Sequence, residues 1–493
     1  MTNALIDAIQ TKDTFTENGM ATHSTSGNYN LDLFFRGGAM RTADEQEILK
    51  VFANAFEEDA LLAMKILFWI RDVRGGAGER RFFKVILNGL MEHYPDIVLK
   101  NLHLIPEFGR WDEVVYIYDR SSDNERLHLA TLSLIKQGLE VGNSLLAKWL
   151  PRKGNIAVKL RTELGWSPKR YRKTLVTLTK VVETQMCAQE WNNIEYSKVP
   201  SVAMSRYRKT FSNHDGARFL EFSNKVIDGE EKINTGAVYP YDVLKAMYNE
   251  WTRIHKPTEP GVAKNIIAQW RSLPNFMENS ENFRMLPICD TSGSMCVEVS
   301  GSTSALQVCI ALGLYIAERN MGVFKDYFIT FSNEPELQKL VGPTIIDKAL
   351  NLSEANWGMN TDLVKTFDLV LNAAVKHNVP QNEMPTHLLI LSDMEFDEAT
   401  SNSSWGDVTE LTPTAMEMIK SKYSSAGYEV PNIIYWNLNS KQSNIPVKVN
   451  EMGTALVSGF SPQILTSLLN GSLNPRQVML DTIETERYAG VRV

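Results

Sequence analysis

The 493-residue chain has few cysteines and no long apolar run. Its N-terminal residues 1–27 are polar and lack the apolar core of a signal peptide, and no segment reaches membrane-spanning length. The thiols show neither the paired spacing of a zinc site nor the density of a disulfide scaffold. We therefore expect a cytoplasmic protein with reduced thiols and no membrane partner. The four cysteines are Cys187, Cys289, Cys296 and Cys309.

Composition and charge set further bounds. Hydrophobic residues make up 43% of the chain and charged residues 22%, values typical of folded globular proteins. A single core stops growing at about 250–300 residues, so this length predicts two domains, or one domain and an elongated helical array. Residues 281–493 hold 14 Lys and Arg against 24 Asp and Glu, a net charge of -10, whereas residues 1–280 hold 37 against 34. The two parts therefore face different partners, or each other.

Apolar residues recur at helical spacing from about residue 42 to residue 270, for example at Ile48, Val51, Phe52 and Ala55. Turn signals containing glycine or proline interrupt this pattern repeatedly. Successive short helices of this kind predict a HEAT-like α-helical repeat array over residues 28–280, preceded by a flexible N-terminus at residues 1–27.

After residue 274, strand-like apolar runs alternate with helical segments. We predict strands at residues 283–289, 327–331, 387–391 and 432–436. We predict helices at residues 304–319, 363–377, 412–425 and 462–470. This alternation predicts a doubly wound parallel α/β sheet of the Rossmann-like class over residues 281–475, with a C-terminal extension at residues 476–493.

Hydroxyl and carboxylate side chains follow the predicted strands, where ligands bind on such sheets. The segment at residues 290–294 is DTSGS, a glycine-containing turn, and the segments NTD at 360–362 and LSD at 391–393 lie at equivalent positions. Hard oxygen ligands favour Mg²⁺, with Mn²⁺ as a substitute, and the absence of cysteine and histidine ligands argues against zinc. The candidate metal ligands are Asp290, Ser292, Ser294, Thr361 and Asp393.

Other interpretations of these segments remain open, and one is that a basic side chain or a sulfate fills the cavity in place of a metal. Ser and Asp after a strand are also ordinary turn and helix-capping residues, although three such segments in order favour a site. A metal-dependent hydrolase is a weaker alternative, because no histidine, cysteine or lysine lies within the motif segments to act as base or nucleophile, although Asp393 could position a water. His387 falls at the opposite edge of the sheet. We predict no catalytic residue and no organic cofactor.

The most biased segment of the chain lies between residues 148 and 180, where ten basic residues face the single acid Glu163. A second basic cluster follows at residues 206–209. The aromatic residues Trp149, Trp166, Tyr171 and Tyr207 are interleaved with these cations and could stack on bases, which favours RNA. A solvated helical face with aromatic residues in the core is the alternative. The candidate RNA-binding residues are Lys148, Arg152, Lys153, Lys169, Arg170, Arg172, Lys173, Arg206, Arg208 and Lys209.

The DxSxS, Thr and Asp pattern resembles von Willebrand factor A (VWA) domains that carry a metal-ion-dependent adhesion site, over roughly residues 281–475. The resemblance implies that Ser292, Ser294 and Thr361 ligate the cation directly. It implies that Asp290 and Asp393 act through bound water, so that the ion can accept a carboxylate from another molecule.

The pattern RD-RGG-GER in residues 70–80 and GRWD at residues 109–112 resemble the TROVE-module Ro proteins over about residues 34–469. The segments KWLPR at residues 148–152 and WGMNTD at 357–362 are closer to an uncharacterised phage, bacterial and plant family. The resemblance implies a helical ring closed against the VWA domain, with structured RNA on its basic outer surface and single-stranded RNA ends in the hole. The glycines of the first motif permit a tight turn, and its charged residues could fasten neighbouring helices.

We therefore expect a monomeric, non-enzymatic, Ro-like protein that binds small structured or misfolded RNA through its helical array. The VWA metal site would dock an acidic protein partner. The alternative is a protein-interaction scaffold that captures an acidic partner, such as a ring ATPase, without RNA.

Overall fold

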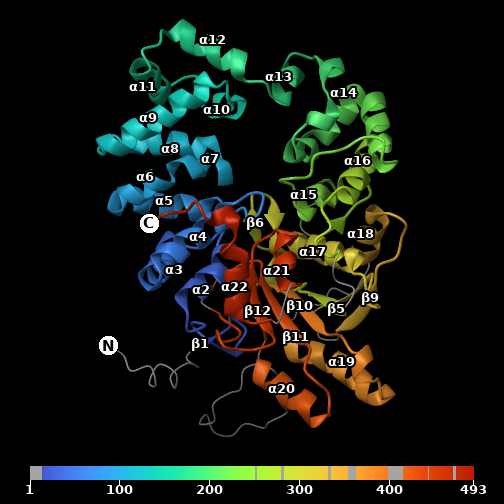
Figure 1. Cartoon of the computed structure of the whole chain (residues 1–493). Helices are drawn as coiled ribbons and strands as arrows, with labels where there is room; N and C mark the ends of the chain where they lie inside the picture. The colour runs from blue at the N-terminus through green and yellow to red at the C-terminus, as the bar shows by residue number, and fades with distance from the viewer. Residues whose placement is uncertain are drawn as a thin grey trace.

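The computed structural model shows a helical region followed by a domain built on a mixed sheet with parallel strands. The expected fold class is confirmed at this level. Figure 1 shows the helices as an arc that starts beside the sheet, runs away from it and returns to it. The described residues are 14–249, 253–278, 283–330, 335–353, 362–397, 415–441, 444–469 and 473–493.

Helix α3 (Glu45–Glu58) illustrates how the sequence makes the helices of the arc. The Asp44 carboxylate caps the first turn by accepting a hydrogen bond from the backbone N–H of Gln46. The predicted apolar face, which includes Ile48 and Phe52, is buried. The other helices of the arc are α2 (Tyr29–Gly37), α4 (Ala60–Arg71), α5 (Arg81–His93), α6 (Pro95–Asn101), α7 (Ile105–Phe108), α8 (Trp111–Arg120), α9 (Glu125–Glu140), α10 (Ser144–Trp149), α11 (Asn155–Glu163), α12 (Pro168–Leu178), α13 (Val182–Cys187), α14 (Ser201–Ile227), α15 (Pro240–Leu244) and α16 (Pro260–Arg271).

The second part contains a six-stranded sheet with the order β12-β11-β10-β5-β8-β9. Neighbouring strands are parallel except for the edge pair β8 and β9, which is antiparallel. All four predicted strands are present with ends shifted by at most two residues, whereas β9 and β12 were not predicted. The strands are β5 (Met285–Cys289), β8 (Tyr327–Thr330), β9 (Glu336–Lys339), β10 (His387–Ser392), β11 (Asn432–Asn437) and β12 (Thr454–Ser458).

The strand order reverses between β5 and β10, because the chain adds β8 and β9 on one side of β5 and the later strands on the other. In doubly wound sheets, ligands bind outside the carboxyl ends of the strands at such a switch point. Helix α17 packs against β5, β8 and β10, whereas α2 and α22 pack against β12. The helices of this part are α17 (Ala305–Arg319), α18 (Ile345–Ser353), α19 (Leu363–His377), α20 (Ala415–Ser425), α21 (Leu465–Leu468) and α22 (Pro475–Ile483).

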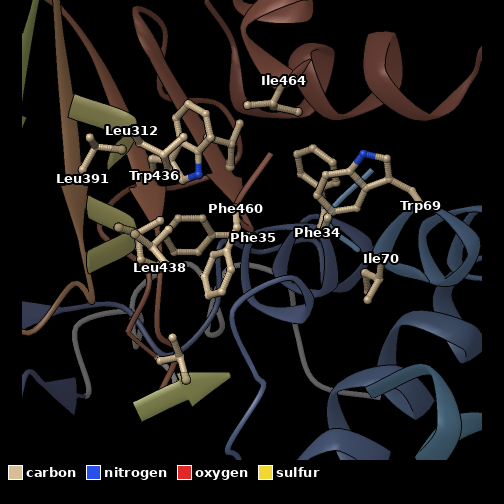
Figure 2. Close-up of a cluster of buried hydrophobic side chains, with 14 of the residues drawn as sticks. Phe34, Phe35, Trp69, Ile70, Leu312, Leu391, Trp436, Leu438, Phe460 and Ile464 are labelled. Carbon is tan, nitrogen blue, oxygen red and sulfur yellow. The ribbon is translucent and has the colours of Figure 1, made fainter. Parts of the chain in front are cut away.

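One hydrophobic core joins the sheet domain to the first half of the arc and to α15 and α16 at its other end. Figure 2 shows Trp436 of β11, Phe35 of α2 and Trp69 of α4 in this core. The rings of Phe34 and Trp69 pack with centroids 4.5 Å apart, and the Ser458 hydroxyl donates a hydrogen bond to the Phe34 carbonyl. A second, smaller core holds α13, α14 and α16 together. No helix in the described part of the chain has the length and apolar character needed to cross a membrane.

The two helical motifs singled out in the sequence contact each other. The Arg71 guanidinium lies 2.6 Å from the Glu113 carboxylate, and each side chain is only 2% exposed. Arg80 forms an ion pair with Asp112 in the first turn of α8. Gly78, in the turn between Arg71 and Arg80, adopts a φ of 65°, in the region that favours glycine. The predicted fastening role of these charged residues is therefore confirmed.

The C-terminal residues, which follow the sheet domain, form hydrogen bonds to the same part of the arc. Asp72, which is buried, accepts hydrogen bonds from the Arg487 guanidinium and the Tyr488 hydroxyl. Asn101 of the arc accepts a hydrogen bond from the backbone N–H of Arg492 at 2.9 Å. Residues 475–493 therefore tie the arc to the sheet domain and are structured along their length.

Candidate functional site

Two predicted ligands meet where the strand order reverses. Asp290 follows β5 and Asp393 follows β10, and the backbone N–H of Asp290 donates a hydrogen bond to the Leu391 carbonyl at 3.0 Å. The Asp290 carboxylate accepts one hydrogen bond from the backbone N–H of Ser292 at 2.9 Å and another from the Ser392 hydroxyl at 2.5 Å. These bonds aim a buried carboxylate at the carboxyl edge of the sheet.

The two serine ligands of the DxSxS turn lie together with these carboxylates. The hydroxyl oxygens of Ser292 and Ser294 are 2.9 Å apart. Ser294 lies close enough to Asp393 for its hydroxyl to lower the pKa of that carboxyl. Thr361 lies outside the described residues, but the next residue, Asp362, is buried and caps the first turn of α19. The structure therefore brings together four of the five predicted ligands.

The electrostatics of this cluster fit a divalent cation. Burial, and then the neighbouring charge of Asp393, raise the pKa of Asp290 to about 7. Burial also raises the pKa of Asp393, although Lys441 acts in the opposite direction. The Asp393 Oδ2 atom accepts no hydrogen bond of normal geometry. The cation nearest to that oxygen is the Lys441 ammonium, at 3.5 Å. Two buried carboxylates beside each other, with two hydroxyls adjacent, are a donor set that Mg²⁺ or Mn²⁺ would neutralise.

The candidate ligands include hydroxyls in addition to carboxylates. Among the described residues, no group of three His, Cys, Asp or Glu side chains gathers in a way that could hold a metal ion. His387 begins β10 at the opposite edge of the sheet, as expected, and its burial lowers its pKa to about 4. The described groups of the arrangement are carboxylates and hydroxyls, which can hold a hard cation. The thiols of Cys289 and Cys309 are buried next to Asp290.

Sequence reasoning missed several residues around the site. Ser392 and Glu395 flank Asp393 in the sequence, so their position beside a candidate ligand was a usable signal. Burial raises the pKa of Glu395 to about 7, and its carboxylate accepts hydrogen bonds from the Asn444 amide at 2.8 Å and from the backbone N–H of Glu17 at 2.6 Å. Asn444 and Glu17 come from distant parts of the chain, and no local pattern pointed to them.

The basic stretch places its most exposed cations on α12. Lys169, Arg170, Arg172 and Lys173 are all exposed, and none forms an ion pair with a described residue. Lys153, just before α11, is exposed in the same way. Figure 1 shows α11 and α12 at the part of the arc farthest from the sheet. This end of the arc therefore carries a group of cations that anions from solution can reach.

Two other predicted RNA-binding residues are engaged within the protein. The Lys148 ammonium lies 2.9 Å from the Glu183 carboxylate. The Arg152 guanidinium donates a hydrogen bond to the Thr179 hydroxyl at 3.1 Å. Both contacts tie α10 and the following turn to the segment that leads into the second half of the arc.

The interpretation of Arg208 as an RNA-binding residue is wrong. Its side chain is buried and donates hydrogen bonds at 2.6 Å to the Val243 carbonyl and to the Gln269 side chain. Burial lowers its pKa to about 9. Arg208 therefore joins α14 to α15 and α16 and cannot meet a phosphate, whereas its neighbours Arg206 and Lys209 are exposed.

The sequence held a signal for this burial. Met204, Arg208 and Phe211 recur at helical spacing, and all three are buried on one face of α14. One aromatic residue of the basic stretch, Tyr171, is buried as well. Tyr171 is a core residue that donates a hydrogen bond to the Pro151 carbonyl, so it is not available to stack on a base.

Comparisons with known proteins show likeness without an assigned activity. The chain is similar to a domain of unknown function, DUF2828, over residues 16–129 and 157–282, and to another, DUF7788, over residues 284–488. Uncharacterized protein L728 of Acanthamoeba polyphaga mimivirus is 27% identical over 522 residues, covering 95% of this chain and 87% of the viral protein. Among solved structures, the Deinococcus radiodurans RO (RSR) protein matches at 13% identity and a TM-score of 0.33, covering 90% of this chain and 94% of that one.

Proposed function

We propose that the chain is a non-enzymatic, Ro-like RNA-binding protein that holds small structured or misfolded RNA on the basic end of its helical arc. The observation that carries this proposal is the group of exposed cations on α12, none of which pairs with a described carboxylate. Arg170 lies over the Trp166 ring, at 4.7 Å from its centroid, which leaves its charge without a carboxylate partner. Cations without a carboxylate partner are free to replace the counterions of a phosphate backbone. The cations are Lys169, Arg170, Arg172 and Lys173.

We also propose that the arc closes into a ring against the sheet domain. In support, both ends of the arc pack on that domain, α2 on β12 and α15 on α17. The two halves of the arc are joined at Glu183, which binds the Lys148 ammonium and accepts a hydrogen bond from the Tyr207 hydroxyl at 3.3 Å. In this proposal, Lys148 closes the ring and α12 meets the RNA.

We further propose that the sheet domain is a VWA domain holding Mg²⁺, or Mn²⁺ in its place. Asp290, Ser292, Ser294 and Asp393, together with Thr361, would hold the ion. The position of the four described residues at the switch point and the raised pKa of both carboxylates support this assignment. When bound, the ion would supply a positive charge that accepts a carboxylate from an acidic protein partner.

Charge reversal on α12 tests the RNA proposal. The triple variant Arg170→Glu, Arg172→Glu and Lys173→Glu is expected to bind a structured small RNA about 10- to 100-fold more weakly at about 0.1 M salt. The slope of log affinity against log salt concentration should fall by about 2–3, because three phosphate contacts are lost. Filter binding or fluorescence anisotropy across a salt series measures both quantities.

The matched control reverses three exposed lysines elsewhere, Lys50, Lys325 and Lys376, which changes the net charge by the same amount. The control should keep the affinity and the salt slope within about twofold, apart from a general electrostatic effect. Equal losses in the two triple variants would show that only net charge matters. Absence of salt-sensitive RNA binding by the unaltered protein would reject the proposal.

A second candidate function is an RNA-free scaffold that captures an acidic partner. The observation that favours it is the metal-site cluster, which consists of Asp290, Ser292, Ser294 and Asp393. These residues come from the sheet domain alone, so the cluster does not depend on RNA bound to the arc. For this candidate, Asp290→Ala should abolish partner binding, and removing nucleic acid with a nuclease should have no effect. Sequencing nucleic acid that co-purifies with the protein separates the two candidates.

A further inference from the structure

Residues 14–23, here called the N-terminal strap, lie across the edge of the sheet that carries the metal-site cluster. The Thr16 hydroxyl donates a hydrogen bond to the Phe396 carbonyl, and the Asn18 amide donates one to the Glu395 carbonyl at 2.7 Å. The backbone N–H of Glu17 donates to the Glu395 carboxylate. All three bonds end on the segment that directly follows Asp393.

The strap is packed into place and is more than a loose tail. Its strands β1 (Thr14–Phe15) and β2 (Ala21–Thr22) form a short antiparallel pair, and Met20 is buried. The cavity left beneath it measures about 10 Å³ and is lined by residues that include Leu363 and Met394. Such a space holds no more than about one water molecule. The strap therefore fits closely over the residues that flank Asp393 and the start of α19.

Lys441 connects the strap to the candidate ligand. Its ammonium lies 3.5 Å from the Asp393 Oδ2 atom and 3.8 Å from the Glu17 carboxylate. The Lys441 side chain is 27% exposed and that of Glu17 is 57% exposed, whereas Asp393 is buried. One cation belonging to the chain thus faces a candidate ligand and an exposed carboxylate of the strap.

Two groups of the protein itself would compete with ligands of the metal site: the Lys441 ammonium with a divalent cation, and the Glu17 carboxylate with the carboxylate of a partner. An ammonium ion and a divalent cation beside one carboxylate repel each other, so binding of either weakens binding of the other. The Glu17 carboxylate stands beside the same site and repels an incoming carboxylate. It also attracts the ammonium that faces Asp393.

From these contacts we propose that Lys441 and the N-terminal strap restrain the metal site, as an internal cation and an internal carboxylate that a divalent ion must displace. This inference rests on the proposed metal site. Metal binding drives Lys441 away from Asp393, which removes one of the contacts that hold the strap, the ion pair with Glu17, and so loosens the strap. The site becomes open to an acidic partner only in the metal-bound, strap-released state.

The first test uses Mn²⁺ alone, with its affinity measured by calorimetry or electron paramagnetic resonance at about pH 8. Lys441→Met is expected to bind Mn²⁺ about tenfold more tightly than the unaltered protein, which lies within the usual range of coupling between two sites. Lys441→Gln should show the same gain and serves if the methionine variant fails to fold. Lys422→Met is the matched control, because Lys422 is a half-exposed lysine of the same domain that pairs with Asp368.

The second test follows the strap itself by hydrogen exchange. Saturating Mg²⁺ should speed exchange of the amides of residues 16–20 in the unaltered protein, and should have no such effect in Asp290→Ala. An affinity for Mn²⁺ that is unchanged or weaker in both Lys441 variants overturns the inference and leaves the metal site standing. Exchange that Mg²⁺ slows or leaves unchanged overturns the role of the strap. Failure of the unaltered protein to bind either ion overturns the inference and the proposed metal site together.

Discussion

Asp290→Asn is expected to make the metal-free protein more stable at about pH 8, by roughly 2–4 kcal/mol, while removing any stabilisation by Mg²⁺. The pKa of this buried carboxyl rises from 3.8 to about 7 in the folded chain. A group whose folded pKa is raised stabilises the fold at low pH, and that contribution is lost as the pH rises through about 7. At about pH 8, the unaltered protein therefore holds a buried charge beside Asp393, and the amide does not.

The amide can keep both local hydrogen bonds. Its oxygen can accept from the backbone N–H of Ser292, and its NH₂ group can donate to the Ser392 hydroxyl, which rotates to accept. Urea denaturation at about pH 6 and about pH 8, with and without Mg²⁺, measures the effect. Asp481→Asn, at an exposed carboxylate of α22, is the control. It should change neither the stability of the metal-free protein nor its stabilisation by Mg²⁺. A less stable Asp290→Asn variant in the metal-free state at about pH 8 would refute this account of the cluster.

Arg71→Met is expected to lower the free energy of unfolding by about 3–5 kcal/mol. The variant leaves the Glu113 carboxylate buried without its principal partner, and Arg80, at 3.9 Å, can replace that partner only in part. Thermal or urea denaturation measures the loss. The double variant Arg71→Met with Glu113→Gln should recover most of it, because neither position of the pair then carries an unpaired buried charge.

Arg126→Met provides the matched control for that experiment. Arg126 pairs with Asp96 at 2.9 Å, but both side chains are more than 70% exposed. Exposed pairs contribute less than about 1 kcal/mol, so the control should change stability by that amount at most. Equal losses at the two arginines would mean that burial of the Arg71 pair has no special effect.

The sequence was most informative where the chemistry is local. The DxSxS turn and the end of β10 each follow a buried strand, so the carboxyl edge of a parallel sheet had to bring Asp290 and Asp393 together. Helical periodicity likewise predicted the buried face of α3. The same periodicity, applied to Met204 and Phe211, would have removed Arg208 from the basic surface.

The parts that the sequence did not reveal depend on contacts between distant segments. Lys441 lies in a loop after β11 and Glu17 lies near the start of the chain, yet both face the segment after β10. The local sequence around Lys441 or around Glu17 does not predict that the two side chains lie close together. Residues 14–27 read as a polar and flexible terminus because their hydrogen-bond partners, such as Glu395 and Ile445, are hundreds of residues away.

The packing of α2 on β12 also constrains how the protein can be made. The Ser458 hydroxyl that binds the Phe34 carbonyl lies 424 residues further along the chain. At about 5–20 residues per second, a ribosome needs roughly 20–85 s to synthesise that length. During this time the apolar face of α2, including Phe34 and Phe35, has no sheet to cover it. We therefore expect nascent chains that end before residue 454 to bind chaperones or aggregate, and folding to finish only after β12 has left the ribosome.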